Sequence, residues 1–372
     1  GVQTCALPIC GFAQPHEVLA VTFTNKAAEE MRERVASLLG SDGGRLWLST
    51  FHALCARLLR REAPAIGLTR DFVIYDSSDQ LTVVKQAFKQ LRIDDGWVQP
   101  RAALSRISQA KNRMESPDDV ANALGASRRD MLVADVYAYY LKALKDASAL
   151  DFDDLLLKTV DLFETSSVTR HKYAEQFKYV MVDEYQDTNR PQYLLIRRLA
   201  ERHRNLAVVG DPDQSIYKWR GADLRNILDF EADFPEATIV KLERNYRSTQ
   251  VILDAASAVI SQNRNRKEKH LWTDQAGGAQ IVYFRGADEL EEADFVMRTA
   301  RTALNDDIDD VVAVLYRTNA QSRAIEDALM REGIPYKVVG GIRFYERKEI
   351  KDALAYMRLI INPHDEIGRA HV

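Results

Sequence analysis

Two neighbouring carboxylates, Asp183 and Glu184, follow an apolar run in the sequence KYVMVDEYQDT (178–188). An apolar strand of this kind would carry both side chains to the open end of a sheet. There, one carboxylate can hold the water shell of Mg²⁺, and its neighbour can orient and deprotonate an attacking water. An acidic strand end that caps the next helix has the same sequence, so the pair alone leaves both interpretations open.

Three further residues could take part in nucleotide hydrolysis. Gln214 lies in VVGDPDQSIYKWRGA, after the next apolar run and within plausible reach of a γ-phosphate. Tyr246 and Arg247 lie in LERNYRST, where a second α/β segment begins. An arginine supplied across a domain cleft can neutralise charge in phosphoryl transfer. Any one of these signals could be a surface salt bridge, but their occurrence in this order, each at a strand end, favours a nucleotide site.

The elements that must position these residues can be read from the hydrophobic pattern. Strand-like runs end in polar residues or glycine and alternate with helical patterns at 18–24, 45–51, 178–184, 205–211 and 238–243. This alternation predicts an α/β fold with parallel sheets, in which ligands collect at the carboxyl ends of the strands.

Two other regions have different patterns. Between Asp76 and Gln176 the strand signal disappears and helical spacing replaces it, which predicts an all-helical accessory domain inserted into the first α/β domain. A second α/β segment begins at about Tyr246. It has predicted strands at 280–286 and 311–317, and a predicted helix closed by Gly333.

Composition limits the class of protein. The chain has 372 residues, of which 46% are hydrophobic and 28% charged, as expected for two to three globular domains. A formal charge of −4 gives no global basic signal, so any nucleic-acid surface must be local. No apolar run approaches the ~18 residues of a membrane span. Three cysteines without framework spacing fit a reducing compartment, and we therefore expect a cytoplasmic protein without a membrane partner.

A series of motifs in fixed order resembles the UvrD/PcrA/Rep helicases of superfamily one. The resemblance extends over roughly residues 11–365 and rests on VTFTNKAAEEM, STFHALCARLLRR, DFDDLLL, VDEYQDTNRPQY, GDPDQSIYKWRGA, LERNYRST, LYRTNAQSR and GGIRFYERKEIKDALAYMRLI. It implies RecA-like P-loop NTPase domains. It also implies ATP-dependent 3′→5′ movement on single-stranded DNA, with duplex unwinding, in bacterial repair and replication.

The same resemblance assigns roles at the nucleotide site. Asp183 would help to hold Mg²⁺, and Glu184 would be the general base. Gln214 and Arg247 would sense or neutralise the γ-phosphate of ATP, and Tyr246 would stack on adenine. The expected cofactors are thus ATP and Mg²⁺.

Single-stranded DNA binding without sequence preference needs aromatic platforms for bases and donors for phosphates. Trp219 stands between Lys218 and Arg220 in a glycine-bounded loop, which favours exposure, whereas Phe23 on an apolar strand is also compatible with the core. The family pattern places stacking residues at Phe23, Phe152, Tyr217 and Trp219, and backbone contacts around Thr24, Thr50 and His52. Asn25 and Arg220 are further candidates in the same motifs. Expected partners are single-stranded DNA, single-strand/duplex junctions and repair proteins. The basic run at 263–270 fits a solvated face, with duplex-phosphate contact as the alternative.

The chain also departs from the family pattern. It has no G-x-x-G-x-G-K-T phosphate loop before residues 18–24. One DNA sequence, read in opposite orientations, can encode both GVQTCALPI at the start and IGRAHV at the end. We therefore expect 1–10 and 367–372 to derive from a sequencing adapter, and the chain to be an internal fragment inactive as an ATPase. The predicted organisation is a first RecA-like domain (11–75 and 176–245), a helical insertion (76–175), a second RecA-like domain (246–340) and the start of a second accessory domain (341–366).

Two alternative functions remain at this point. A helicase subunit of a recombination helicase–nuclease complex would carry the same motor motifs. A non-catalytic scaffold that binds single-stranded DNA would not need Asp183, Glu184, Gln214 and Arg247 together, and their joint presence argues against it.

Overall fold

The computed structural model describes residues 13–39, 46–218, 221–263, 266–306 and 311–339, together with 352–353 and 356–357. The expectations for 1–10 and 367–372 lie outside the described residues, as does almost all of 341–366. The chain divides into two compact units: Gly1–Ile239 with Asn265–Lys267 and Lys348–Val372, and Val240–Arg264 with Glu268–Arg347.

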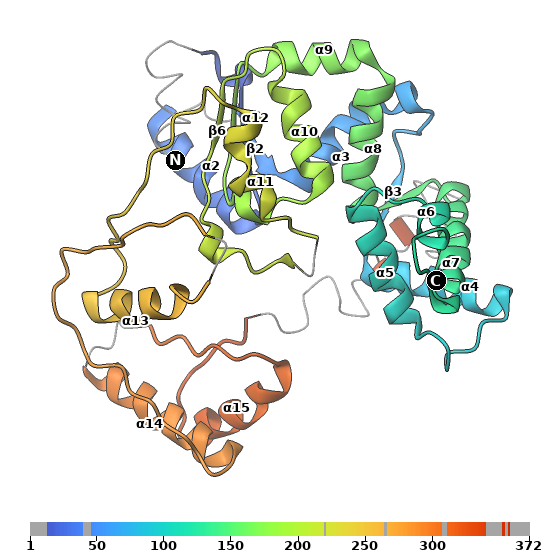
Figure 1. Cartoon of the computed structure of the whole chain (residues 1–372). Helices are drawn as coiled ribbons and strands as arrows, with labels where there is room; N and C mark the ends of the chain where they lie inside the picture. The colour runs from blue at the N-terminus through green and yellow to red at the C-terminus, as the bar shows by residue number, and fades with distance from the viewer. Residues whose placement is uncertain are drawn as a thin grey trace. The chain divides into compact units, whose positions relative to one another are not determined.

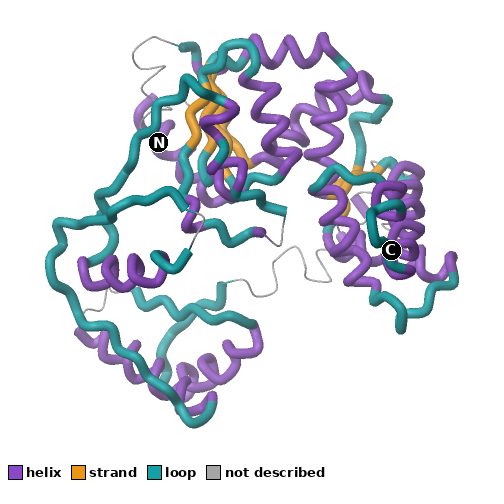
Figure 2. The backbone as a smooth tube through the Cα atoms, viewed as in Figure 1, coloured by secondary structure: helices purple, strands orange, loops and turns teal. Residues whose placement is uncertain are grey.

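A four-stranded parallel sheet forms the centre of the first unit (Figures 1 and 2). Its strands lie in the order β2 (Trp47–Thr50), β1 (Val18–Thr22), β5 (Tyr179–Val182) and β6 (Leu206–Val208). Val182 is level with Val21 on one neighbour and with Val208 on the other. The carboxyl ends of β1, β5 and β6 therefore meet at one edge. The strands predicted at 18–24, 45–51, 178–184 and 205–211 are confirmed, each somewhat shorter than its apolar run.

Helices cover both faces of this sheet, which is why β1 is apolar at every position but its last. Leu19 and Val21 point into a core that includes residues of α3 (Phe51–Glu62), α8 (Phe152–Thr165) and α10 (Arg190–Ala200). Val18 and Ala20 point the other way and pack against α2 (Asn25–Leu39). The α/β fold class with parallel sheets is thus confirmed.

A second hydrophobic core lies among the helices that follow the first two strands of this sheet. These helices are α4 (Ser77–Leu91), α5 (Pro100–Asn112), α6 (Pro117–Ala121) and α7 (Arg128–Asp146). Contrary to the all-helical expectation, β4 (Ala149–Asp151) pairs in parallel with β3 (Val73–Tyr75). Three residues are too few to show a strand period, and the partner strand is distant in sequence. The helices belong to the same compact unit as the main sheet, so a separate inserted domain remains a prediction.

Short elements connect these parts of the first unit. They are η1 (Pro15–Glu17), η3 (Ala63–Ile66), α9 (Ser167–Gln176), η4 (Tyr185–Asp187), η5 (Pro212–Gln214), α11 (Arg225–Leu228) and α12 (Phe230–Asp233). None of the helices in the described part of the chain combines the length and apolarity that a membrane crossing requires.

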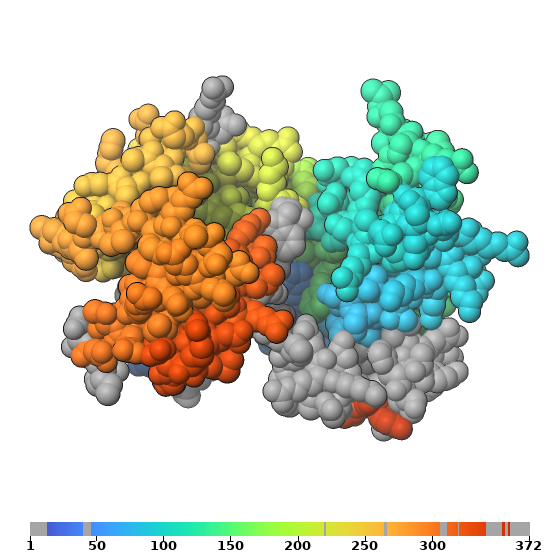
Figure 3. Space-filling model, turned by 90° about the horizontal axis from the view of Figure 1, so that it is seen from below, coloured from blue at the N-terminus to red at the C-terminus, as the bar shows by residue number. Residues whose placement is uncertain are grey.

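The second unit contains α13 (Gln250–Ile260), α14 (Glu289–Asp306), η7 (Asn319–Gln321) and α15 (Ser322–Arg331). Helices α14 and α15 lie side by side (Figure 1) and share a small core of Ala293, Met297, Ala328 and Leu329. In the space-filling view the orange and red-orange residues of this region form one continuous surface (Figure 3). The predicted helix end is confirmed, because Gly333 takes the left-handed conformation that closes a helix (φ +67°).

The strands predicted at 238–243, 280–286 and 311–317 are wrong, because none of the three runs forms a strand. Among the described residues beyond β6, the only strand-like pairing is an isolated bridge between Arg244 and Trp272. A strand requires a hydrogen-bonded partner, which a run of β-branched residues does not by itself supply. Without one, Val282 and Tyr283 stay exposed.

Candidate functional site

The loop that leaves β5 carries the two predicted carboxylates at the shared edge of the sheet. The backbone N–H of Asp183 donates to Val21 O on one neighbouring strand at 3.0 Å, and that of Tyr185 donates to Val209 O on the other side at 2.9 Å. These bonds fix the loop between both neighbours. Glu184, between them, is exposed and adopts a left-handed backbone (φ +52°). Asp183 is partly buried, and this burial, together with the charge of Glu184, raises the pKa of its carboxyl.

A buried glutamine, Gln186, connects the ends of β5 and β6. Its Nε2 donates to Glu184 Oε2 at 2.7 Å, and its Oε1 accepts from the backbone N–H of Asp211 at 2.9 Å. The backbone of Gly210 lies so close that a Cβ there would stand 2.6 Å from Gln186 Oε1. A side chain at position 210 would therefore displace the amide that holds Glu184.

Gln214 continues this chain of hydrogen bonds. Its Nε2 donates to Asp211 Oδ2 at 2.8 Å, while Asp211 Oδ1 accepts from the backbone N–H of Asp213 at 3.0 Å. Glu184, Gln186, Asp211 and Gln214 thus form one continuous network across two strand ends. The structure brings three of the sequence-predicted residues, Asp183, Glu184 and Gln214, to the same edge. Their roles remain predictions.

One residue of the basic run at 263–270 is not part of a solvated face. Arg266 Nη2 lies 3.0 Å from Asp213 Oδ2, and both side chains are largely buried. The next residue, Lys267, forms a more exposed pair with Glu231. Arg266 therefore supports the loop that carries Gln214.

Tyr246 and Arg247 belong to the second unit. Tyr246 is 72% exposed, and the guanidinium of Arg244 lies 4.7 Å from the centre of its ring. Arg247 is exposed, and its backbone N–H donates to Asn245 Oδ1 at 2.9 Å. An exposed ring and an exposed guanidinium can both reach a ligand, so the predicted adenine and phosphate roles remain open to these residues.

Phe152 and His52 form an aromatic pair on the surface of the first unit. Phe152 is the first residue of α8 and is 47% exposed. Its ring meets that of His52 edge-on at 5.8 Å between centroids. Burial lowers the pKa of His52, so its imidazole is neutral at pH 7. His52 can therefore offer DNA a hydrogen bond but no charge at that pH.

The two threonines among the predicted DNA contacts both accept a backbone hydrogen bond in the first turn of a helix. Thr24 Oγ1 accepts from Ala27 N at 3.1 Å at the start of α2, and Thr50 Oγ1 accepts from Ala53 N at 3.4 Å at the start of α3. Thr24 is exposed and Thr50 is buried. Of the two hydroxyls, only that of Thr24 is accessible without rearrangement.

The remaining predicted DNA contacts differ in exposure. Asn25, the first residue of α2, is exposed. Phe23 is partly buried, packs on the core and contacts Phe51 edge-on at 5.6 Å. Tyr217 is partly buried in the loop after Gln214. Trp219 and Arg220 lie outside the described residues.

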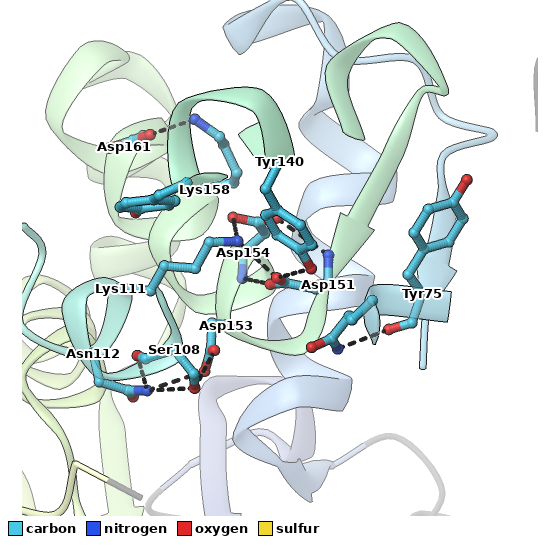
Figure 4. A network of polar contacts seen from close by, with 12 residues as sticks. Tyr75, Ser108, Lys111, Asn112, Tyr140, Asp151, Asp153, Asp154, Lys158 and Asp161 are labelled. Carbon is cyan, nitrogen blue, oxygen red and sulfur yellow. Dashed lines mark hydrogen bonds and ion pairs between the residues drawn. The ribbon is translucent and has the colours of Figure 1, made fainter. Parts of the chain in front are cut away.

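A buried lysine that the sequence did not single out fixes the start of α8 (Figure 4). Lys111 Nζ lies 2.7 Å from Asp151 Oδ2 and 2.7 Å from Asp154 Oδ1, and Tyr140 donates to Asp151 at 2.8 Å. Although burial opposes it, the attraction of the two carboxylates raises the pKa of Lys111. Asp151 is also the N-cap of α8, so this cluster sets the position from which Phe152 projects.

Comparison with known proteins places almost the whole chain in one group. Residues 9–235 match the UvrD/REP helicase N-terminal domain, and residues 240–372 match the UvrD-like helicase C-terminal domain. The chain is 50% identical over 361 residues to the ATP-dependent DNA helicase PcrA of Bacillus subtilis, covering 95% of this chain and 48% of that protein. It is 51% identical over 359 residues to PcrA of Leuconostoc citreum, covering 94% of this chain and 47% of that protein. The chain therefore spans about half the length of the curated relatives it matches.

Proposed function

Since this chain belongs to the UvrD/REP helicase family, we propose that the complete protein is an ATP-dependent DNA helicase that moves 3′→5′ on single-stranded DNA. Its proposed cofactors are ATP and Mg²⁺. Its proposed partners are single-stranded DNA, single-strand/duplex junctions and repair proteins in the bacterial cytoplasm. The predicted domain boundaries are part of this proposal.

The observation that carries the proposal is the hydrogen-bond network from Glu184 through Gln186 and Asp211 to Gln214. Hydrolysis requires a base beside the attacking water and a donor near the γ-phosphate, held at a fixed separation. Glu184 accepts the proton of the water. Gln186 holds that carboxylate in place, and the amide of Gln214 hydrogen-bonds the phosphate.

The oxygen groups at this edge suit a hard cation. Asp183 is a partly buried carboxylate, and within the described residues the buried hydroxyl of Thr22, at the end of the adjacent β1, has no hydrogen-bond partner. Mg²⁺ prefers oxygen ligands and is held by one or two carboxylates together with water and substrate phosphates. Asp183 would hold the ion through its water shell. When bound, Mg²⁺ neutralises charge on the phosphate oxygens.

The remaining proposed roles are those that the family resemblance and the side-chain chemistry suggest. Arg247 supplies positive charge to the transferred phosphoryl group, and Tyr246 stacks on adenine. On the DNA side, Phe152, Tyr217 and Trp219 stack on bases, while Phe23, Thr24, Asn25, Thr50, His52 and Arg220 line the path of the strand. Neutral aromatic platforms tolerate any base, which a translocating protein needs.

Glu184→Gln in the complete protein tests this function. An amide can still hydrogen-bond water but cannot accept its proton, so steady-state ATP turnover should fall by about 10²- to 10⁴-fold. Equilibrium binding of ATP and DNA should persist. Glu29→Gln, an exposed change on α2, is the matched control. Near-normal turnover in Glu184→Gln would remove Glu184 from the role of base.

A further inference from the structure

Asn112, the last residue of α5, lies where three functional segments of the first unit meet. Its side chain is only 7% exposed. It contacts the segment that follows the carboxylates, the start of the helix that carries Phe152, and the loop that carries Tyr217. Neither its helix position nor its residue type marks it as functional in the sequence.

The first two contacts use the two ends of the Asn112 amide. Its Oδ1 accepts from Asn189 Nδ2 at 2.5 Å, and Asn189 is the N-cap of α10, which begins directly after the loop of Asp183 and Glu184. Its Nδ2 donates to Asp153 Oδ1 at 3.1 Å and to Ser108 O at 2.7 Å (Figure 4). Asp153 directly follows Phe152. The amide orientation is determined by its partners, because a donor faces its oxygen and acceptors face its nitrogen.

The third contact is steric. Gly221 closes the loop that begins at Gln214, with its N–H donating to Lys218 O at 3.0 Å. A Cβ on Gly221 would lie 2.7 Å from the Cβ of Asn112, and its φ of +85° also favours glycine. The backbone of Gly221 therefore lies directly against Asn112.

We infer that Asn112 is a positioning residue that couples the nucleotide site to the single-stranded DNA platform, an inference that rests on the proposed function. A displacement of Gly221 or of the start of α10 would move the Asn112 side chain. Asn112 in turn holds Asp153, the residue that follows Phe152. Asparagine suits this position because its neutral amide accepts on one side and donates on the other. Alanine would remove the hydrogen bonds at both ends of the amide. Aspartate would keep the bond from Asn189 but would oppose the bonds to Asp153 and Ser108 O.

The surroundings of Asp153 make the aspartate variant informative. Burial and the charge of Asp151 raise the pKa of Asp153 to about 6, while the hydroxyl of Ser108 and the charge of Lys111 oppose that shift and Asp154 adds to it. At pH 8 Asp153 is ionised and would repel a carboxylate at position 112. As the pH falls to 6, one of the two carboxyls takes up a proton and can donate to the other.

The experiment uses the complete protein and measures ATPase activity with and without a single-stranded oligo-dT, at pH 8 and pH 6. In Asn112→Ala, turnover without DNA should stay within about twofold of wild type, while stimulation by oligo-dT should fall at least about tenfold. Asn112→Asp should show the same loss at pH 8 and regain several-fold stimulation at pH 6. Asn122→Ala and Asn122→Asp, at the exposed asparagine that follows α6, are the controls and should behave as wild type.

Each other outcome is decisive. Wild-type stimulation in both Asn112 variants would overturn the inference. So would a parallel loss of basal and stimulated turnover with a lower melting temperature and no recovery at pH 6, because that pattern shows a purely structural residue. If wild-type protein itself shows no DNA-stimulated ATPase, the proposed function fails, and the coupling role fails with it.

Discussion

The amide of Gln186 holds the carboxylate of Glu184, with 2.7 Å between Nε2 and Oε2. The Oε1 of the same amide accepts from the backbone N–H of Asp211, which follows β6. The position of the Glu184 carboxylate is therefore fixed relative to β6 as well as to β5, the strand that precedes Glu184. The role of base that we propose for Glu184 requires this support, because the residue itself is exposed.

Replacing Gln186 should therefore impair catalysis more than binding. We expect Gln186→Ala to lower kcat for ATP hydrolysis by about 10- to 100-fold, because small misplacements of a catalytic group have effects of this size. KM for ATP should change little. Gln186→Glu, which keeps the shape but repels Glu184, should be at least as defective. Gln90→Ala, at an exposed glutamine of α4, serves as the control. Normal kcat in both Gln186 variants would show that Glu184 is positioned by other groups.

Phe152→Ala should weaken binding of single-stranded DNA by ~1–3 kcal/mol, the contribution of one stacked base. Its ring is about half exposed, so the melting temperature should change little. Phe23→Ala is the informative comparison, because that ring packs on the core and its loss should lower the melting temperature. Fluorescence anisotropy and thermal denaturation separate the two effects. A lower melting temperature with unchanged DNA affinity in Phe152→Ala would place Phe152 in the core.

Removing Lys111 should destabilise the first unit strongly. Lys111→Met leaves Asp151 and Asp154 buried without a counter-ion, and breaking a buried pair in this way costs about 3–5 kcal/mol. Lys158→Met, which breaks the exposed pair with Asp161, should cost no more than about 1 kcal/mol. Chemical denaturation of both variants makes the comparison. Equal effects would show that the buried cluster contributes no more than a surface pair.

The pH dependence of the stability lost in Lys111→Met follows from the direction in which the pKa of Lys111 is shifted. Its folded pKa is raised, so its stabilisation is fully present below the ordinary lysine pKa of about 10.4 and is lost only as pH rises through the higher folded value. The deficit of Lys111→Met should therefore be the same at pH 7 and pH 9. A deficit that disappears by pH 9 would contradict a raised pKa.

His52 should make the protein sensitive to mild acid. Its folded pKa is lowered by burial, so the unfolded chain binds the proton first as pH falls below about 6.5. The stabilisation present above that pH is lost as pH falls toward the lowered folded value. His52→Gln should reduce the drop in melting temperature between pH 7.5 and pH 5.5, whereas His171→Gln, at an exposed histidine, should not. Identical drops in wild type and His52→Gln would exclude this role.

The sequence was informative where local pattern and tertiary pairing agree. Four apolar runs in the first unit pair as strands of one sheet. The positions of Asp183, Glu184 and Gln214 therefore follow directly from where those strands end. The runs at 280–286 and 311–317 have the same composition but no partner strand, and composition alone cannot reveal that difference.

The supporting residues were not predictable for another reason. Gln186 has a local signal, since it lies two residues after Glu184, but its second contact is to a backbone N–H 25 residues away. Asn112 meets a partner 77 residues away, and Lys111 meets partners 40 and 43 residues away. A polar side chain on a helix has no periodic signature that distinguishes such a buried contact from exposure to solvent.

The left-handed backbone of Glu184 makes selection for stability and selection for activity favour different residues at this position. A non-glycine residue with φ of +52° carries roughly 1–2 kcal/mol of unfavourable backbone energy, which glycine would avoid. Glycine, however, has no carboxylate to accept a proton. A mutant library of the complete protein sorted for thermal resistance alone should therefore enrich Glu184→Gly, and the same library sorted for cell survival after DNA damage should discard it. Glu184 thus keeps a carboxylate at this edge of the sheet at a cost in backbone energy.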